Sequence, residues 1–587
     1  MRSRFIPALV LVCGAVFLCR PPQVALGGPG TAADVERATA ELTAVKRWLY
    51  FPIRTSFAPV PNALRRTVKV SCEGKVVRVI SAELADQSPG WWSPLDIRAW
   101  KGRKLVVQVD RLPAGSKALE LLHQSDAWEN AEQLYHEPLR PQFHFSARRG
   151  WLNDPNAFFY YEGEYHLFFQ HDPFCWDGAV KHWGHAVSRD LLHWKELDEA
   201  IYADEQGACW SGSGVVDWKN TSGLGCDGRP PLALAYTRAG NPFTQCLAFS
   251  SDGREFLNYP HNPVVPNIIS GNRDPKLLWH EPSQRWVMAV YLGLPSDRKA
   301  DGSVSYTNIV QFLNSPNLRD WKFQGVVEGF CECPDLFEIP LDGDLANRKW
   351  IVMGANGTYA VGSFNGKHFL PETDLIASRQ NATYYASQTF NRIPHQDGRC
   401  IQMIWFRIPM PGMCFNQAMS VPLELTLHAT PQGPRLRSLP AAELDTLRAG
   451  ALLTIKDRPL AAGDDPLAGM EGRLLDVKLD ADCRSSAGVE LTIQGVPIRY
   501  DARRHVLSCL GQEAYADSPD GHVRLRALAD VGSLEIFAQQ GAVVIPAALP
   551  ADRPNPTKLG LRSLGGQPRI VSLEAWRLKS IWDAQSK

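Results

Sequence analysis

The sequence predicts an all-β fold in which a five-bladed β-propeller is flanked by a small N-terminal β-sandwich and a C-terminal β-sandwich. Three observations support this: the chain length, an alternating pattern near both ends, and a motif that recurs through the middle. With 587 residues, the chain exceeds the roughly 250 to 300 residues that one core sustains, so several packed units are expected. A hydrophobic content of 44% against 21% charged residues excludes a disordered chain.

Residues 1–27 have the layout of a secretory signal peptide. The apolar run Phe5–Leu18 follows two arginines, and small residues lie near Ala25. A run of about 14 residues is too short for a helix that spans a bilayer. We therefore expect a secreted mature chain, extracellular or periplasmic, with no membrane attachment after the signal is removed. A lipid anchor at Cys13 or Cys19 is the weaker alternative.

The two ends of the mature chain show the alternation of half-buried strands. It is seen in Lys104–Val109 near the N-terminus and in Leu534–Phe537 near the C-terminus. Gly and Pro turns separate these runs, as in small antiparallel sandwiches. We therefore expect an N-terminal β-sandwich over residues 33–136 and a C-terminal β-sandwich over residues 436–587.

The middle region, residues 137–435, repeats a motif of Ser, then Asp or Asn two residues later, then an aromatic residue four further on. Such a motif is typical of a turn followed by an aromatic plug. Two strand-like runs precede each copy, and Tyr384–Phe390 with Cys400–Phe406 opens a fifth unit. Four-stranded units at this spacing predict five propeller blades; a row of hairpins in a two-sheet sandwich is the alternative. The four copies are Ser188–Trp194, Ser250–Phe256, Ser315–Trp321 and Ser363–Phe369.

Three carboxylates occupy equivalent places in this repeat. Asp154, Asp274 and Glu332 lie at the start of the first strand of blades one, three and four. Because the first strand of each blade lines the central channel, the three side chains should meet at one mouth of it. Like charges brought together cost energy unless chemistry uses them, although a calcium site would also collect carboxylates.

Paired carboxylates among aromatic residues indicate glycoside hydrolysis. One carboxylate attacks or stabilises the anomeric carbon, while the other stays protonated to donate to the leaving oxygen. Mutual repulsion is expected to raise the pKa of the acid. Eighteen Trp, 15 Tyr and 24 Phe supply flat faces on which sugars stack. A net charge of zero makes nucleic acid an improbable partner.

These motifs resemble glycoside hydrolase family 32, the invertase, inulinase and levanase family, from about Tyr135 to the C-terminus. Asp530, Ser533, Glu535 and Phe537 resemble the signature of the family's last domain, and the N-terminal sandwich is similar to that of bacterial levanase-type members. The matching strings, in chain order, are Arg140–Phe145, Trp151–Asn156, Tyr165–Gln170, His182–Ser188, Trp210–Ser213, Arg273–Pro275 and Glu332–Asp335.

The resemblance implies a role for each matching residue. Asp154 would be the nucleophile that attacks C2 of a β-fructofuranosyl unit, Glu332 the general acid and then base, and Asp274 the transition-state stabiliser. The family retains configuration, so the carboxyls of Asp154 and Glu332 should stand roughly 5 to 5.5 Å apart. No metal or cofactor is implied. The residues expected to bind the fructosyl unit are Asn153, Gln170, Trp183, Trp210, Ser211 and Arg273.

Several functions compete on this site. The first is a hydrolase releasing fructose from the non-reducing ends of levan, inulin or sucrose; the second is a fructosyltransferase using the same covalent intermediate. A catalytically inactive fructan-binding propeller and an inverting arabinan or xylan hydrolase are further alternatives. Ala157 and Thr383 depart from the family pattern, and Thr383 leaves sugar contacts from blade five open. Linkage preference, exo or endo action, oligomeric state and glycan binding by the end domains are not predicted.

Overall fold

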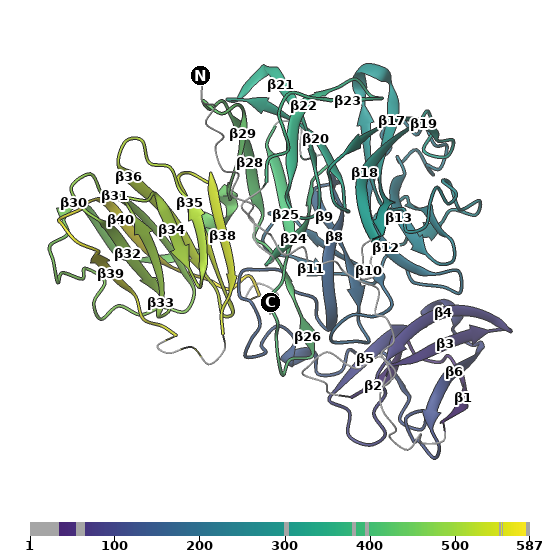
Figure 1. Cartoon of the computed structure of the whole chain (residues 1–587). Coiled ribbons are helices and arrows are strands. Elements are labelled where there is room, and N and C mark those ends of the chain that lie inside the picture. Colours follow the sequence, from purple (N-terminus) through teal and green to yellow (C-terminus); the bar gives the residue numbers. More distant parts are fainter. Residues whose placement is uncertain are drawn as a thin grey trace.

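The computed structural model describes residues 35–54, 65–298, 304–377, 383–391, 393, 398–550, 553 and 556–582. The predicted signal peptide lies outside these ranges. Within them the chain is almost entirely β-structure, which confirms the all-β class (Figure 1). None of the helices found there has the length and apolar character needed to cross a membrane. They are four short 3-10 helices: η2 (Arg98–Trp100), η3 (Ala131–Gln133), η4 (Glu281–Ser283) and η5 (Ala442–Leu447).

The N-terminal unit consists of two facing sheets with strand orders β1-β6-β3-β4 and β5-β2-β7. Alternate residues of β3 are buried, because one face of this sheet covers the core. Phe174, from the propeller, inserts into this core beside Phe51. The strands are β1 (Val35–Thr43), β2 (Trp48–Ile53), β3 (Arg66–Cys72), β4 (Lys75–Ala82), β5 (Trp91–Asp96), β6 (Lys104–Pro113) and β7 (His123–Ser125).

Five blades follow, each with four antiparallel strands in chain order from the axis outward. Their first strands, β8, β12, β16, β20 and β24, contact one another in that order, and β24 contacts β8. The ring is thereby closed, as a five-bladed propeller requires. Additional pairing comes from β26 (Phe415–Asn416), which joins β8 in parallel, and β27 (Ala418–Met419), which pairs with β25.

The blade strands have these limits. Blade one contains β8 (Gly150–Tyr161), β9 (Glu164–Asp172), β10 (His182–Ser188) and β11 (Lys195–Glu196); blade two contains β12 (Ala208–Val216), β13 (Leu232–Ala239), β14 (Phe243–Ser250) and β15 (Leu257–Asn258). Blade three contains β16 (Arg273–His280), β17 (Arg285–Arg298), β18 (Val304–Ser315) and β19 (Lys322–Glu328). Blade four contains β20 (Asp335–Leu341), β21 (Asp344–Met353), β22 (Tyr359–Phe364) and β23 (Phe369–Pro371); blade five contains β24 (Tyr384–Thr389), β25 (Cys400–Phe406), β28 (Leu423–His428) and β29 (Arg435–Pro440).

The recurring motif is the turn between the third and fourth strands of blades one to four. In the first copy, Asp190 accepts hydrogen bonds from Ser188 Oγ at 3.0 Å and from the backbone N–H groups of Leu192 and His193 at 3.0 and 2.8 Å. The aromatic plug Trp194 is buried. Sequence reasoning found two strands ahead of each motif and overlooked the third, because strands such as β10 are buried on both faces and do not alternate. In the other three copies the side-chain oxygens that accept from backbone N–H groups belong to Asp252, Asn317 and Asn365.

The C-terminal unit packs a sheet of order β30-β40-β31-β36-β37-β38 against one of order β35-β34-β33-β32-β39. Because β29 completes blade five, the propeller continues past residue 435 to Pro440. The strands of this sandwich are β30 (Arg448–Pro459), β31 (Leu475–Asp482), β32 (Gly488–Ile493), β33 (Val496–Asp501), β34 (Val506–Cys509), β35 (Gln512–Tyr515), β36 (His522–Ala529), β37 (Ser533–Ala538), β38 (Val543–Ala548), β39 (Gly560–Ser563) and β40 (Arg569–Leu578).

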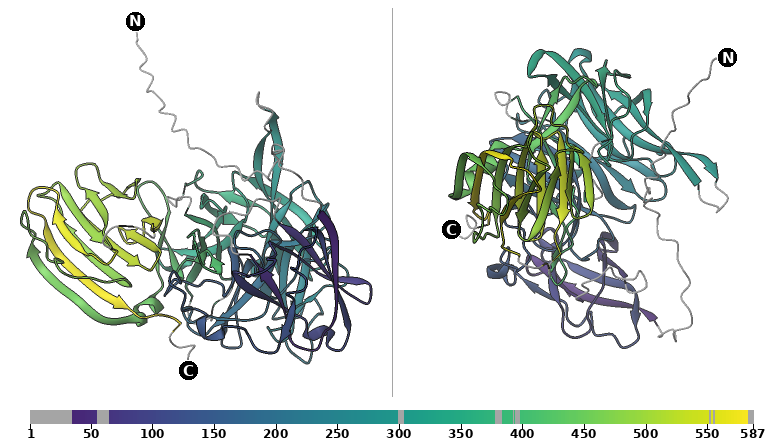
Figure 2. Two further views of the ribbon diagram at one scale, coloured as in Figure 1. Left: turned by 90° about the horizontal axis from the view of Figure 1, so that it is seen from below. Right: turned by 60° about the vertical axis from the view of Figure 1, so that its left-hand side comes forward.

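The C-terminal sandwich is anchored to the segment that leads into the propeller. Trp582 stacks on Tyr135 with ring centroids 4.1 Å apart, and its indole N–H donates to the Pro141 carbonyl at 2.7 Å. The two sandwiches flank the propeller at separate places, as Figure 1 and the left view of Figure 2 show.

Candidate functional site

Most of the predicted site residues lie at irregularities of the inner strands. The pairing of β8 with β9 shifts register between Leu152 and Pro155, and that of β16 with β17 shifts between Arg273 and Lys276. Asp154 and Asp274 fall within these two bulges. The pairing of β12 with β13 has a similar shift around Ser211. A bulge turns a side chain away from the regular pleat, and here it presents polar groups to the mouth of the channel.

Asp154 receives a directed chain of hydrogen bonds from blades one and two. The Trp151 indole N–H donates to Asn153 Oδ1 at 2.8 Å, and Asn153 Nδ2 donates to Gln170 Oε1 at 3.0 Å. Gln170 Nε2 donates to Ser211 Oγ, which in turn donates to Asp154 Oδ2 at 2.6 Å. Because each donor points toward the next acceptor, Asp154 is the terminal acceptor and its carboxylate form is stabilised.

Glu332 and Asp274 meet at Arg273. The Arg273 Nη2 and Nε atoms lie 2.7 and 3.0 Å from Glu332 Oε2, and Nε lies 3.6 Å from Asp274 Oδ2. The Tyr385 hydroxyl donates to the other oxygen of Glu332 at 2.5 Å. One guanidinium and one phenol therefore orient the Glu332 carboxyl group from opposite sides.

Cys333 joins a second pair of acids, Asp154 and Asp274. Its Sγ lies 3.6 Å from Asp154 Oδ2 and 3.5 Å from Asp274 Oδ2, and its backbone N–H donates to Asp274 at 3.0 Å. The side chains of all three acids consequently belong to one cluster, here called the acid cluster, which Arg273 and Cys333 link together. Both Asp274 and Cys333 have left-handed backbone conformations, with φ of 63° and 46°. Such conformations are costly for these residues and persist where the surroundings impose them, often at functional sites.

The environment of the acid cluster raises the pKa of two carboxyl groups. Burial raises the pKa of Asp154, although hydrogen bonds from Ser211 and Asn153 oppose this rise. Burial raises the pKa of Asp274 to about 7; Arg273 opposes the rise, and Glu332 and Asp154 add to it. The carboxyl group whose pKa lies near neutral pH is thus that of Asp274. The resemblance implied no proton transfer by this residue.

The remaining predicted binding residues fall into two groups: those in the hydrogen-bond chain to Asp154, and the two tryptophans Trp183 and Trp210. Asn153, Gln170 and Ser211 take part in the hydrogen-bond chain that ends at Asp154. Trp210 packs edge-on against Phe243. Trp183 has an exposed fraction of 0%, and its indole N–H donates to the Trp210 carbonyl at 3.1 Å. Trp183 therefore holds the Trp210 backbone in place, and its contact with a substrate stays a prediction.

Sequence reasoning missed an aromatic and cationic rim. Trp405 contacts Trp151 edge-on at 5.8 Å between centroids. The Arg407 guanidinium lies over the rings of Tyr385 and Trp405, at 4.2 and 4.3 Å. The Arg407 backbone N–H donates to the carbonyl of Thr383 at 2.8 Å. The aromatic run ahead of Arg407 was the available signal, but nothing in the sequence placed it next to Glu332.

A buried ion pair fixes the inner strands below the acids. Lys276 Nζ lies 2.9 Å from Asp335 Oδ1, and both side chains are almost fully buried. Lys276 also donates to the Thr389 carbonyl at 3.0 Å, and the Thr389 backbone N–H donates to Asp335 at 2.7 Å. Blades three, four and five are thus joined a few residues from Asp274, Glu332 and Tyr385. Such a pair is costly to break because one charge would be left buried alone.

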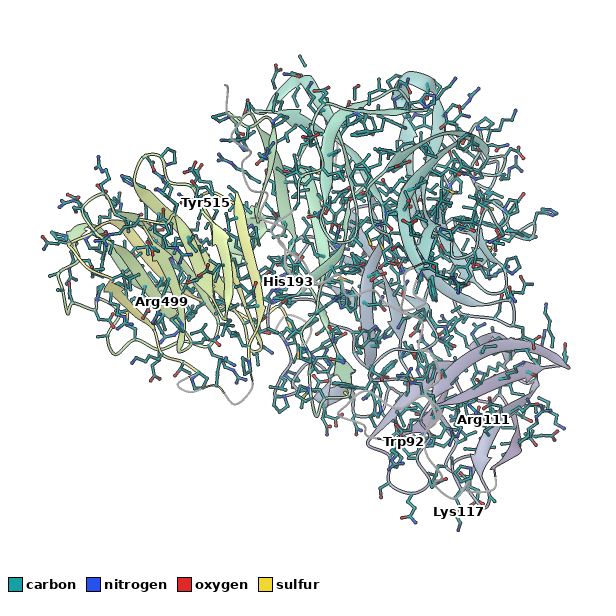
Figure 3. The ribbon with its side chains drawn as sticks, in the orientation of Figure 1. Trp92, Arg111, Lys117, His193, Arg499 and Tyr515 are labelled. Carbon is teal, nitrogen blue, oxygen red and sulfur yellow. The ribbon has the colours of Figure 1, made fainter. Side chains whose placement is uncertain are left out.

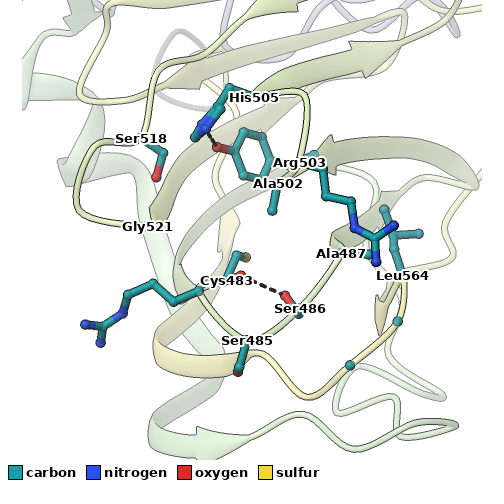
Figure 4. A pocket seen from close by; sticks show the side chains of 14 residues that line it. Cys483, Ser485, Ser486, Ala487, Ala502, Arg503, His505, Ser518, Gly521 and Leu564 are labelled. Carbon is teal, nitrogen blue, oxygen red and sulfur yellow. Dashed lines mark hydrogen bonds between the residues drawn. The ribbon is translucent and has the colours of Figure 1, made fainter.

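A cavity of about 720 Å³, far from the acid cluster in the chain, lies in the C-terminal sandwich (Figure 4). It contains Arg484, Arg503 and His505, and no carboxyl group lines it. It therefore lacks the acids that cleave a glycosidic bond. Across the described ranges, no group of three or more His, Cys, Asp or Glu side chains is arranged to hold a metal ion.

The closed propeller and the acid cluster define the class of protein as a propeller-type glycosidase. Comparison with known proteins supports this. The family model for the N-terminal domain of glycosyl hydrolases family 32 matches residues 144–440. A levanase of Bacillus subtilis is 33% identical over 517 residues, which is 79% of this chain and 74% of the levanase. An extracellular exo-inulinase of Aspergillus niger is 28% identical over 535 residues, covering 76% of this chain and 96% of that protein.

Solved structures agree in fold. The crystal structure of an exo-inulinase from Aspergillus awamori superposes with a TM-score of 0.67 at 24% identity, covering 76% of this chain and all of that one. The chain belongs to glycoside hydrolase family 32 and is a glycosidase of the β-fructosidase type. This confirms the resemblance seen in the motifs.

Proposed function

We propose that the protein is a secreted, retaining glycoside hydrolase that releases fructose from the non-reducing ends of levan, inulin and sucrose. The observation that carries the proposal is the acid cluster, in which Cys333 and Arg273 link Asp154, Asp274 and Glu332. The relatives named as levanase and exo-inulinase support the choice of substrates. Their extracellular location, where named, and residues 1–27 support secretion.

In the proposed mechanism Asp154 attacks C2 of the terminal fructosyl unit while Glu332 protonates the oxygen of the leaving sugar. The bond from C2 to that oxygen breaks, and a covalent fructosyl-enzyme forms. Water then attacks C2, the bond between C2 and the Asp154 oxygen breaks to regenerate the Asp154 carboxylate, and the proton of the water passes to the Glu332 carboxylate, which Arg273 contacts. Arg273 and Asp274 hold the sugar hydroxyls, and these bonds strengthen as positive charge develops on the ring.

The proposal extends to the pocket and the domain limits. Asn153, Gln170, Trp183, Trp210 and Ser211 bind the fructosyl unit, and Trp183 also holds the Trp210 backbone in place. No metal or cofactor takes part. The N-terminal sandwich covers residues 33–136, the catalytic propeller residues 137–440 and the C-terminal sandwich the remainder.

The nucleophile is tested by Asp154→Asn. This change should lower kcat on sucrose, inulin and levan by about 10³-fold or more, because the covalent step loses its attacking group. The folded state should be unchanged, as judged by circular dichroism. Retention of more than a few per cent of activity would remove Asp154 from that role.

The products separate hydrolysis from transfer. The wild-type protein is incubated with sucrose, and free fructose is weighed against new oligosaccharide; we expect fructose to dominate. Predominant oligosaccharide would identify a fructosyltransferase. With methanol as acceptor, nuclear magnetic resonance should show the β-fructoside, whereas the opposite anomer would refute a retaining mechanism.

A further inference from the structure

The outer parts of β17 and β18 form a two-stranded arm that begins next to Arg273 of the acid cluster. Strands β17 and β18 stay paired from Gly293 to Arg298, beyond the point where the flanking strands β16 and β19 stop pairing with them. The pairing with β16 ends at Arg273 opposite Tyr291, so the arm begins beside the site. Figure 2 shows this teal hairpin standing out from the rest of the propeller.

One face of the arm forms a continuous strip from the site outward. Tyr291, Gly293 and Pro295 alternate on β17 and are paired with Val310, Asn308 and Tyr306 on β18. Directly paired residues point to the same side of a sheet, so all six share one face. The Tyr291 hydroxyl donates to Asn308 Oδ1 at 2.8 Å, as this arrangement requires.

The strip starts at the catalytic arginine and ends at an exposed ring. The Arg273 guanidinium lies 4.5 Å from the centroid of Tyr291, which is buried. Tyr306, at the outer end, has an exposed fraction of 50%. A Cβ at Gly293 would stand 3.0 Å from the Tyr291 hydroxyl and 3.6 Å from the Tyr306 ring. The two tyrosines thus close over Gly293, and any side chain at this position would press against the Tyr291 hydroxyl and the Tyr306 ring.

Resting on the proposed function, we propose that this strip binds the leaving part of a fructan chain, with Tyr306 as its outer stacking platform. Glu332 protonates the leaving oxygen, so the leaving chain begins beside Glu332 and the adjoining Arg273. Exposed aromatic rings with neighbouring polar groups suit the apolar and hydroxyl faces of a sugar. Pro295, opposite Tyr306, lies about 13 Å along the strand from Tyr291, beyond the single glucosyl unit that leaves from sucrose.

The inference is tested by chain length. Tyr306→Ala should lower kcat/KM on long fructo-oligosaccharides, levan and inulin by about three- to tenfold through KM, the value of one lost aromatic contact. Sucrose turnover should be unchanged, and Tyr306→Trp should retain the wild-type profile. The matched control is Tyr515→Ala, an equally exposed tyrosine on the C-terminal sandwich (Figure 3).

Binding provides a second readout that does not depend on turnover. Calorimetry with fructo-oligosaccharides of increasing length is performed on Asp154→Asn with and without Tyr306→Ala. Affinity should rise with length in the first protein and level off in the second. Equal loss on sucrose and polymer, no loss on either, or no rise of affinity with length would each overturn the proposal. Absence of wild-type turnover on every fructoside would instead count against the proposed hydrolase.

Discussion

At the scale of single residues, the hydrogen bond from Ser211 to Asp154 controls the charge of the proposed nucleophile. Burial raises the pKa of Asp154, and the Ser211 hydroxyl opposes this by donating to the ionised form. Asp154 attacks only as a carboxylate. Activity should therefore be present above its pKa and be lost as the pH falls through that value.

Ser211→Ala should move the acidic limb of the kcat/KM profile to higher pH, because the pKa of Asp154 rises further when this donor is lost. The activity ratio of variant to wild type should consequently be smaller at pH 5 than at pH 7. Initial rates on sucrose across this range provide the measurement. A uniform loss at all pH values would show that Ser211 contacts the substrate without tuning Asp154.

Tyr385 orients the second proposed catalytic residue, Glu332, by donating a hydrogen bond to its carboxyl group. Tyr385→Phe removes the hydroxyl that lies 2.5 Å from Glu332 Oε1 but keeps the ring under Arg407. We expect kcat on sucrose to fall about 10- to 100-fold with little change in KM, since a misplaced acid is less effective. An aryl fructoside with a good leaving group should lose less. Equal losses on both substrates would argue against a role in proton donation.

At the scale of strands and turns, the blades rely on one repeated capping device. The acceptor of the first copy, Asp190, satisfies two backbone N–H groups in a tight turn and is fixed by Ser188. The backbone hydrogen bonds recur at Asp252, Asn317 and Asn365, and the serine contact recurs at Asp252 and Asn317. The motif was readable in the sequence because its hydrogen bonds are local.

Asp190→Ala should destabilise blade one by about 1 to 2 kcal/mol, the usual cost of losing such a cap. The first thermal transition, followed by calorimetry, should occur at lower temperature. Asp320→Ala changes an exposed acid of the third copy, which accepts a hydrogen bond from the Asn317 side chain and none from a backbone N–H group in the described part of the chain, and it should be nearly neutral. Equal effects of the two changes would contradict the capping role.

At the scale of the whole molecule, a buried histidine joins the propeller to the C-terminal sandwich. His144 Nδ1 lies 2.8 Å from Asp530 Oδ2, and Nε2 lies 2.8 Å from Glu535 Oε2. Glu535 also accepts from the hydroxyl of Tyr384, the neighbour of Tyr385 on β24. Burial alone would lower the pKa of His144, but Glu535 and Asp530 raise it to about 9. The imidazolium form therefore holds the two domains together.

The sign of the pH dependence follows from this raised value. The stabilisation is fully present below the unfolded pKa of about 6.5 and is lost as the pH rises through about 9. The melting temperature of the wild type should fall between pH 6.5 and 9.5 by more than that of His144→Gln. His261→Gln, at an exposed site, should follow the wild type. Parallel curves for all three proteins would refute the ionic link.

The sequence by itself determined the strand composition, the repeat of the blades and the three acids, because alternation, turn residues and repeat position are local properties. Asp154, Asp274 and Glu332 could be selected since they occupy the same place in successive units. The tertiary structure alone decided the bulges at the inner strands, the sharing of Arg273 between Glu332 and Asp274, and the approach of Cys333 to two acids. It also placed Tyr385 on Glu332 and Trp183 on the backbone of Trp210. The bulges lie between neighbouring strands of one blade, whereas the contacts of Glu332, Cys333 and Trp183 join different blades, and no local pattern encodes such contacts.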